Sequence, residues 1–341
     1  MVSTKLEIIM PLERFQDLNA RIEMSENSLV SIIIPCREID SYARECVRHC
    51  RQLDYRDFEI ILLPDDDGEK VEEARVIATG HVTPGAKRNI GIVNSYGEIC
   101  AFIDSDAYPT KDWLTNAIKY FDDPKVAGVG GPGLTPEEDG VMQRASGHIL
   151  SSFMVGSLSS RYRAEHSFES DDIHSCNFVA RKDVLKDFGG WNEKYWPGED
   201  TLICLAIKKL GKKLVEASDV VVYHHRRPLF ALHLEQVSRF GLHRGFFARR
   251  FKGNSFKLAY FMPSLLLLSL FAGGLTAFFN SFFVNVLLLI SGVYLLSCLI
   301  AALVVAKPKE LVPLVWFGIM ATHFVYGLSF LAGFMKRDLP R

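Results

Sequence analysis

Three long apolar segments near the end of this 341-residue chain constrain its fold more than any other feature. They cover Leu258–Phe279, Phe282–Ala306 and Leu311–Phe334, and none of them contains Asp, Glu, Lys or Arg. Each has the roughly 20 residues that a helix needs to cross the hydrocarbon core of a bilayer. Helices buried in a soluble domain usually keep a polar stripe, which these segments lack. The sequence therefore predicts that the region 258–341 is inserted in a membrane.

The charges beside these segments predict their orientation. The stretch from Ile207 to Lys257 has 12 Lys and Arg against 3 Asp and Glu. By the positive-inside rule, this basic stretch places the large N-terminal part in the cytoplasm, and Lys307 and Lys309 agree. Three full crossings would put the C-terminal cations on the non-cytoplasmic side, against the positive-inside rule. A first segment that is kinked or re-entrant, and does not cross fully, is therefore an alternative. These cations are Lys336, Arg337 and Arg341.

The first residues and the cysteines fit the same compartment. Glu7, Glu13 and Asp17 interrupt any apolar stretch at the start, so no signal peptide is expected. Seven cysteines are scattered without the spacing of a zinc site. Free thiols in a reducing compartment are therefore expected.

Between these ends, the chain alternates between predicted strands and predicted helices. We expect strands over the apolar runs Val30–Pro35, Phe58–Pro64, Ile99–Ile103 and Asp219–Tyr223. We expect helices over Tyr42–Leu53, Lys70–Ala78, Gly85–Ser95, Trp113–Phe121 and Glu199–Leu210. The region Leu134–Ser170 is expected to form a mobile loop. Strands that alternate with helices indicate an α/β domain with parallel strands.

Asp104 and Asp106 follow the predicted strand Ile99–Ile103 directly. In open α/β sheets, ligands bind beyond the carboxyl ends of such strands. Two carboxylates this close repel each other unless a cation lies between them. Hard oxygen ligands suit Mg²⁺ or Mn²⁺. The alternative is a polar surface turn after the strand.

Five motifs in order resemble the family 2 glycosyltransferases, which have a GT-A fold. They are Ser31–Pro35, the acidic end of the second strand at Asp65–Gly68, Gly85–Gly91, Phe102–Asp106, and Phe188–Asn192 leading to Gly198–Asp200. The resemblance covers about residues 29–227. It implies a Rossmann-like mixed sheet with helices on both faces, and inverting transfer of a sugar from a nucleotide-diphosphate donor with Mg²⁺ or Mn²⁺.

The resulting domain plan has four parts. Residues 1–28 form an N-terminal extension, and 29–227 form the GT-A catalytic domain. Residues 228–257 form an amphipathic interfacial helix region, and 258–341 form the transmembrane region with about three apolar segments.

The resemblance also implies which residues bind the donor. Asp106 and Asp104 are expected to hold the metal and the donor, with His224 as a third metal ligand or a diphosphate contact. A surface histidine is the alternative for His224. The nucleotide is expected against Pro35, Cys36, Glu38, and either Asp65 or Asp66. The sequence Lys87, Arg88 and Asn89 opens a predicted helix and suits phosphate, although solvated surface charge explains it nearly as well.

A second carboxylate pair is expected to face the acceptor. We predict that Asp200 is the catalytic base that inversion requires, and that Glu199 binds the acceptor. The alternative is an acidic pair that only complements the dipole of its helix. Trp191 and Trp196, in the preceding aromatic loop, are expected to contact the acceptor sugar.

The region 228–257 contains a basic and aromatic helix, as in helices that lie on anionic membranes. Gln236, Arg239 and Phe240 resemble the QxxRW motif of membrane-bound synthases, with Phe in place of Trp. The motif implies contact with the acceptor, against the alternative of a plain amphipathic helix.

These features predict an integral membrane glycosyltransferase with its catalytic domain in the cytoplasm. Its expected partners are a nucleotide sugar, a lipid-linked or glycan acceptor and membrane lipid, but no nucleic acid; oligomers are possible. The alternatives are a polyprenyl-phosphate sugar synthase, which needs no base, and a processive polysaccharide synthase, which needs more membrane helices. A membrane scaffold with a degenerate transferase domain predicts broken metal or base motifs.

Overall fold

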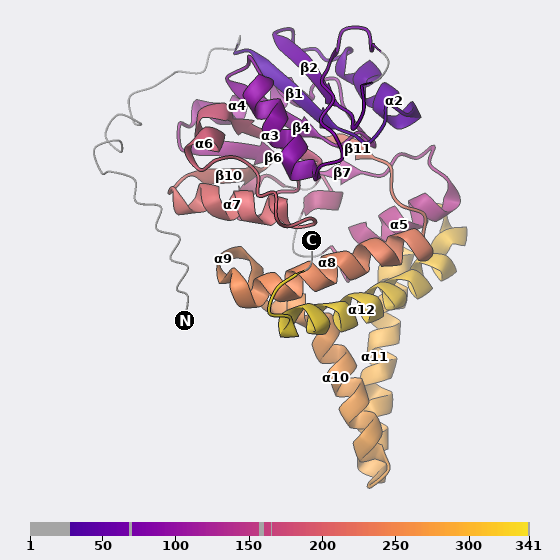
Figure 1. The fold of residues 1–341 in the computed structure, drawn as a ribbon. Helices are drawn as coiled ribbons and strands as arrows, with labels where there is room; N and C mark the ends of the chain where they lie inside the picture. The colour runs from indigo at the N-terminus through magenta and orange to yellow at the C-terminus, as the bar shows by residue number, and fades with distance from the viewer. Residues whose placement is uncertain (1–27, 68–69, 157–159, 165, 340–341) are drawn as a thin grey trace, which may run out of the picture.

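A computed structural model describes residues 28–67, 70–156, 160–164 and 166–339. An α/β part contains all eleven strands of the described residues, and the helices α8 to α12 follow it (Figure 1). The predicted N-terminal extension lies outside the described residues, apart from Ser28. The arrangement confirms an α/β domain followed by helices long and apolar enough to cross a membrane.

A mixed sheet of eight strands forms the centre of the α/β part, in the order β3-β2-β1-β4-β9-β6-β10-β8. The strands β3, β2, β1 and β4 are parallel, as the alternation with helices predicts. The strand β9 runs antiparallel to both β4 and β6, which makes the sheet mixed. The bounds are β1 Val30–Pro35, β2 Phe58–Leu63, β3 Arg75–Val76, β4 Ile99–Ile103, β6 Val126–Gly130, β8 Phe168–Ser170, β9 Asn177–Arg181 and β10 Lys213–Glu216.

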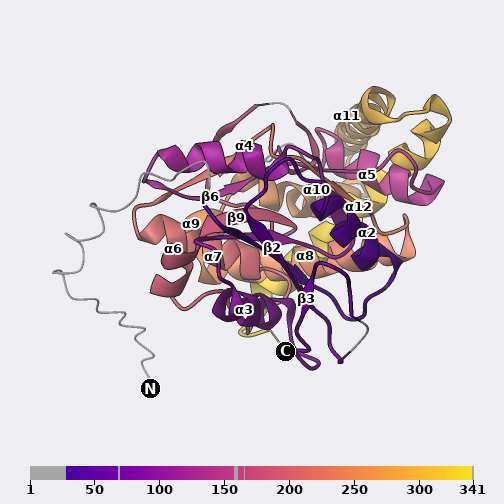
Figure 2. The same ribbon diagram turned by 90° about the horizontal axis from the view of Figure 1, so that it is seen from above.

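Helices cover both faces of this sheet, and its central strands β1 and β4 are therefore buried on both sides (Figure 2). Ile32 and Ile34 of β1 pack in one core with α2 and α4, whereas Ile33 packs in the other core with α3, α6 and α7. This follows the period of two in a strand. The bounds are α2 Ser41–Cys50, α3 Pro84–Asn94, α4 Trp113–Lys119, α6 Lys182–Asp187 and α7 Glu199–Lys209. Short 3₁₀ helices occupy Tyr120–Asp122, Ser160–Tyr162 and Lys309–Leu311.

A second, three-stranded sheet lies at the carboxyl end of β4. It has the order β5-β11-β7, with bounds Ala107–Pro109, Val222–His224 and Gly133–Leu134. The antiparallel register pairs Ala107 with His224. The histidine at the end of β11 is thereby fixed beside the turn that follows β4.

Two sequence expectations are wrong. The stretch Lys70–Ala78 forms no helix; it contains turns and the short strand β3, which completes the edge of the sheet. The region Leu134–Ser170 contains the helix α5 (Val141–Ser151), whose Ala145 and Ile149 pack against the C-terminal helices. These small and apolar residues were a signal for that helix.

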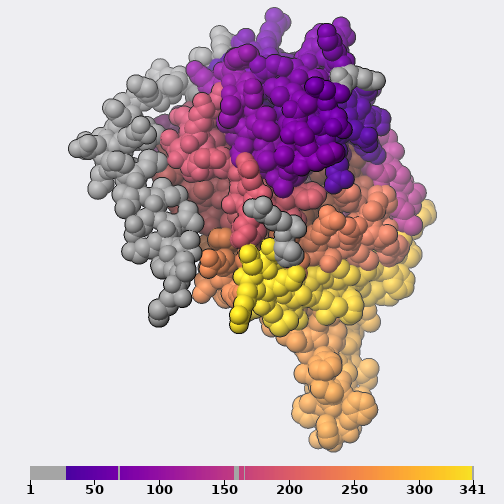
Figure 3. All heavy atoms as spheres, in the orientation of Figure 1, coloured from indigo at the N-terminus to yellow at the C-terminus, as the bar shows by residue number. Residues whose placement is uncertain are grey.

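Helices α8 (Ala231–Arg250) and α12 (Val312–Met335) lie side by side beneath the α/β part (Figure 1). Glycines allow this close approach, since a Cβ on Gly245 or Gly333 would meet the backbone of the other helix. The short helix α9 covers Lys252–Ser255, and α10 (Leu258–Ala277) and α11 (Ser281–Val305) form a hairpin that projects away. In the space-filling view, α12 covers the upper end of this hairpin (Figure 3).

Candidate active site

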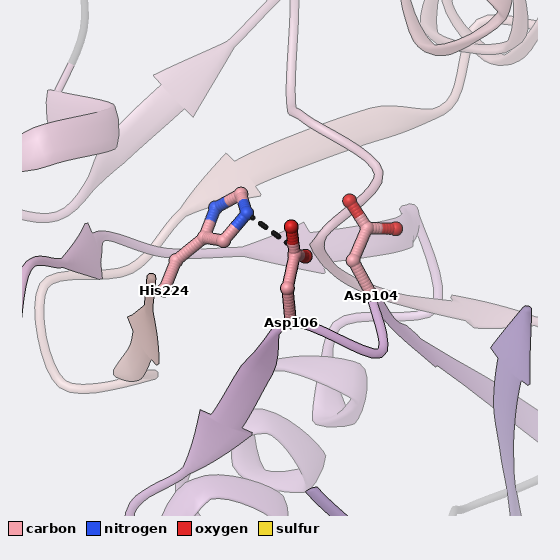
Figure 4. Close-up of side chains that lie close together, drawn as sticks. All are labelled: Asp104, Asp106 and His224. Atoms are coloured by element: carbon pink, nitrogen blue, oxygen red, sulfur yellow. Dashed lines mark ion pairs between the residues drawn. The ribbon is translucent and has the colours of Figure 1, made fainter. Parts of the chain in front are cut away.

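Three potential metal ligands meet beside the carboxyl end of β4. One ligand atom from each of Asp104, Asp106 and His224 lies within 4.8 Å of the others (Figure 4). The Nε2 atom of His224 lies 3.1 Å from Oδ1 of Asp106. Two carboxylates and one imidazole form a donor set that fits Mn²⁺, and Mg²⁺ through the oxygen atoms. The structure therefore brings together the three residues predicted from the sequence for the metal site.

The charges in this cluster support one another. Burial favours the neutral form of Asp106, but His224 and Arg227 hold the pKa of Asp106 below its usual value. Burial also opposes the charged form of His224, but Cys176 and Asp106 raise the pKa of His224 to about 10. The imidazole must lose this proton to coordinate a metal ion, because a protonated ring has no free lone pair. Binding of a cation is thus coupled to proton release at this cluster.

Arg88 connects the metal cluster to the second carboxylate pair. Its guanidinium group donates to Oδ1 of Asp104 and to Oε1 of Glu199, both at 2.8 Å, and also to Ser175. The side chain is only 2% exposed, so the solvated-surface alternative is wrong for Arg88. This bridge was not predicted, because the sequence does not reveal which helix face carries the arginine.

Lys87 is also buried, and it organises the end of β2. Its Nζ lies 2.6 Å from Oδ1 of Asp65 and donates to the Leu63 carbonyl and to Thr79. Hydrogen bonding to Lys87 lowers the pKa of Asp65. The solvated-surface alternative is therefore wrong here too. Asp65 has protein partners, whereas the neighbouring Asp66 is exposed.

Asn89 and Trp191 hold the loop that precedes α7. The Asn89 side chain accepts from the Trp191 backbone N–H and donates to its carbonyl. The Trp191 ring is 2% exposed and packs on Phe102 and Phe178. The predicted acceptor contact of Trp191 is therefore wrong, because the ring belongs to the core. Asn89 fixes the backbone of this loop, and its amide also donates to Glu193.

Glu199 and Asp200 open α7, but their side chains have different surroundings. Glu199 is 4% exposed and bound to Arg88, and burial raises its pKa to about 7 against the effect of that arginine. Asp200 is half-buried, lines the cavity, and accepts a hydrogen bond from the Thr201 backbone. Gly198 adopts φ +113° against the Phe247 ring of α8, so α8 supports this turn directly. Both carboxylates line the cavity, but Asp200 is the more exposed of the two.

One cavity of about 2230 Å³ joins these elements. It extends from the carboxyl ends of β1, β2 and β4, past Asp200, to the helices α8, α10 and α12. Trp196 is 42% exposed on its wall. The remaining predicted site residues that line it are Pro35, Cys36, Glu38, Asp65, Asp66, Lys87, Arg88, Asp104, Asp106, His224, Glu199, Gln236, Arg239 and Phe240.

Comparison with protein families identifies the α/β part. Residues 31–189 match the family model described as Glycosyl transferase family 2. The chain contains a family 2 glycosyltransferase domain. The matched region includes the metal cluster aspartates, Lys87 and Arg88.

Curated relatives agree with this assignment. The chain is 28% identical over 211 residues to a pre-mycofactocin glycosyltransferase of Mycobacterium tuberculosis, covering 59% of this chain but 43% of that protein. The chain thus spans less than half the length of this relative. It is 24% identical over 274 residues to a dolichyl N-acetyl-alpha-D-glucosaminyl phosphate 3-beta-D-2,3-diacetamido-2,3-dideoxy-beta-D-glucuronosyltransferase of Methanococcus voltae, covering 74% of this chain and 84% of that protein.

A solved structure has the same fold over nearly the whole chain. It is a mannosyltransferase of Pyrobaculum calidifontis in complex with GDP-Man and Mn²⁺, with a TM-score of 0.61 and 16% identity. The match covers 94% of this chain and 93% of the other. The likeness confirms the GT-A fold and includes the C-terminal helices.

Proposed function

We propose that this enzyme transfers a sugar, with inversion, from a nucleotide-diphosphate donor to a hydroxyl group of a lipid-linked saccharide. The observation that carries the proposal is the continuous cavity between the metal cluster, Asp200 and the apolar helices. A donor at the cluster and an acceptor held at the membrane would meet at Asp200. The relative from Methanococcus voltae, whose name specifies a dolichyl-linked sugar phosphate, supports this acceptor class.

Several groups in the cavity have roles in this reaction. Asp104, Asp106 and His224 would hold Mg²⁺ or Mn²⁺, which supplies charge stabilisation for the departing diphosphate. The nucleotide would lie against Pro35, Cys36, Glu38 and the exposed Asp66. Because Asp200 faces the cavity, its free carboxylate oxygen can take the proton of the acceptor hydroxyl as the bond to the sugar forms. Arg88 donates hydrogen bonds to Asp104 and Glu199 and so holds both carboxylates in place.

The acceptor side is formed by α8 and the aromatic loop. Arg239 lies 5.9 Å from the Trp196 ring centre, and Gln236 and Phe240 line the same cavity. These groups suit a sugar, since an aromatic ring packs on its apolar face while an amide and a guanidinium bond its hydroxyls. A polyprenyl-phosphate sugar synthase would need no base at Asp200. A processive synthase would need more than the three apolar helices found among the described residues.

A transfer assay tests this function. Membranes that contain the enzyme are incubated with a panel of radiolabelled nucleotide sugars and Mn²⁺ or Mg²⁺, and the lipids are then extracted and hydrolysed in mild acid. We expect labelled lipid that releases an oligosaccharide, with transfer abolished by EDTA. Release of a labelled monosaccharide would support the polyprenyl-phosphate alternative, and absence of transfer from every donor would contradict the proposal.

We further propose that only α10 and α11 cross the membrane and that α12 lies at its cytoplasmic surface. Contacts along α12 join it to the α/β part and to α8, at Gly318, Thr322 and Gly333. Its most apolar window is 44% buried, against 6% and 17% for α10 and α11. Because α12 packs against α5 and α8 along its length, it cannot insert into the bilayer without separating from them. Two crossings also keep Lys336 and Arg337 in the cytoplasm, as the positive-inside rule requires.

Labelling of single introduced cysteines tests this topology, because all seven native cysteines are buried. A membrane-impermeant maleimide is applied to intact cells. We expect Phe279→Cys, at the tip of the hairpin, to be labelled from outside. We expect Arg337→Cys to react only after permeabilisation, like the control Glu72→Cys on the exposed surface of the catalytic domain. Labelling of Arg337→Cys in intact cells would establish a third crossing.

A further inference from the structure

Two arginines in the cavity have no part in the proposed reaction. Arg161, in the 3₁₀ helix Ser160–Tyr162, and Arg244, on α8, each place Nη2 3.0 Å from the same Oδ2 atom of Asp172. The other oxygen of Asp172 accepts from Thr201. One carboxylate therefore faces two guanidinium groups, and one of its oxygens is shared between them.

Both arginines also carry N–H groups that lack a partner. Nε of Arg161 and Nη1 of Arg244 are buried and form no hydrogen bond with the part of the chain that the structure describes. The Tyr260 ring covers Arg244 at 4.6 Å and holds its plane in place. Buried donors without acceptors cost free energy, so the described residues do not fully satisfy these two guanidinium groups. The exposed parts of the two groups can donate charge-assisted hydrogen bonds to an anion. Each arginine side chain keeps 16% exposure, toward the cavity that both line.

The position of this pair narrows the class of anion. Asp172, which both arginines contact, accepts from Thr201, the residue after Asp200, so the pair lies near the proposed base. On the membrane side, the same cavity is lined by Met262, Pro263 and Leu266 of α10. An anion bound at the arginines would thus have the reaction centre on one side and apolar helices on the other. This arrangement fits a phosphate with a sugar at one end and a hydrocarbon chain at the other.

We propose that Arg161 and Arg244 form the subsite for the phosphate group of a lipid-phosphate-linked acceptor. This inference rests on the proposed function and names the part of the acceptor that the enzyme recognises. The guanidinium groups bind the phosphate, the hydrocarbon chain follows α10 toward the bilayer, and the attached sugar extends to Asp200. Among the described residues, Asp104 and Asp106 pair with Arg88 and His224, whereas these two arginines pair with Asp172, which favours the acceptor phosphate over the donor diphosphate as their ligand.

Binding of farnesyl phosphate to the full-length protein in a neutral maltoside detergent tests the subsite. The variants are Arg161→Met and Arg244→Met, with Arg250→Met as the matched control on the exposed end of α8. Each test variant leaves Asp172 one arginine partner, so the core keeps its ion pair. We expect either variant to weaken farnesyl phosphate binding by about 10- to 100-fold, the usual range for a charge-assisted hydrogen bond. Binding of neutral farnesol should not change.

The controls separate this subsite from general damage and from the transferase function. Equal losses for farnesyl phosphate and farnesol would overturn the proposal, as would unchanged farnesyl phosphate binding in both variants. Inorganic phosphate that competes as strongly as farnesyl phosphate would overturn the assignment to a lipid. Nucleotide binding with Mn²⁺ is measured on the same preparations and should persist in both variants. If the unaltered protein binds farnesyl phosphate through the arginines but binds no nucleotide, the transferase function fails and the lipid subsite stands.

Discussion

Replacing Asp200 by Asn is expected to lower kcat by about 10²- to 10⁴-fold, the usual contribution of a general base. Asparagine has nearly the same shape, and its side-chain oxygen can still accept the bond from the Thr201 backbone that Asp200 accepts. It cannot take a proton from the acceptor hydroxyl at neutral pH. Binding of the nucleotide with Mn²⁺ should stay the same, because Asp200 is not one of the three grouped ligands Asp104, Asp106 and His224. Calorimetry with the nucleotide and single-turnover transfer assays measure the two effects.

The matched control is Asp171→Asn, which removes another carboxylate of the same cavity. Asp171 pairs with Lys257 and is about as exposed as its partner, so its loss should change kcat little. A second comparison is Glu199→Gln, which leaves Asp200 in place but removes the negative charge that pairs with Arg88. If Asp200→Asn transfers sugar at the normal rate, the base is another group. A parallel loss of nucleotide binding would instead indicate damage to the fold.

The metal cluster shows how far strand patterns predict a site. The apolar run of β4 ends at Asp104, and this alone placed two carboxylates at the ligand-binding edge of the sheet. The resemblance to the family added His224. The structure supplies the physical reason, which is the pairing of β11 with β5. Such long-range pairing has no signature within either segment, so the sequence could propose the histidine but could not place it.

The directions of buried side chains could not be predicted. Lys87 and Arg88 are neighbours on one helix, and both side chains are buried because they form ion pairs with carboxylates on other elements. The sequence places Trp191 in an aromatic loop, but in the structure its ring packs against Phe102 in the core. Arg161 and Arg244 come together at Asp172, with which both form ion pairs. In each case the partner lies on a distant segment, so local patterns contain no information about it.

The apolar helices were predicted, but their arrangement was not. Hydropathy treats α10, α11 and α12 alike, since all three are long and apolar enough to span a bilayer. The distinguishing signal is in the small residues, because Gly241 and Gly245 on α8 match close approaches to α12. A polar link, Ser146–His233–Thr322, also joins α5, α8 and α12. These features explain why α12 packs against α8 and is linked to α5.

Replacing Asp106 by Asn is expected to lower kcat/KM by about 10³-fold, by weakening the charge stabilisation of the departing diphosphate. The loss should be accompanied by a fall of more than about 100-fold in Mn²⁺ affinity, since even groups outside the ligand set contribute 10- to 100-fold. Asp106 contacts His224 directly, so its carboxylate is central to the cluster. Calorimetric titration of Mn²⁺, with and without a nucleoside diphosphate, measures the affinity.

The control for this variant is Asp112→Asn, which removes a carboxylate from the exposed start of α4, outside the cavity. It should bind Mn²⁺ and the nucleotide like the unaltered enzyme. The two predictions then separate the halves of the site, because Asp106→Asn should lose metal-dependent nucleotide binding and Asp200→Asn should lose only transfer. Normal Mn²⁺ affinity in Asp106→Asn would refute the metal assignment. A structure that brings Asp104, Asp106 and His224 within 4.8 Å would then need another explanation, namely an ion-pair network that only stabilises the β4–β5 turn.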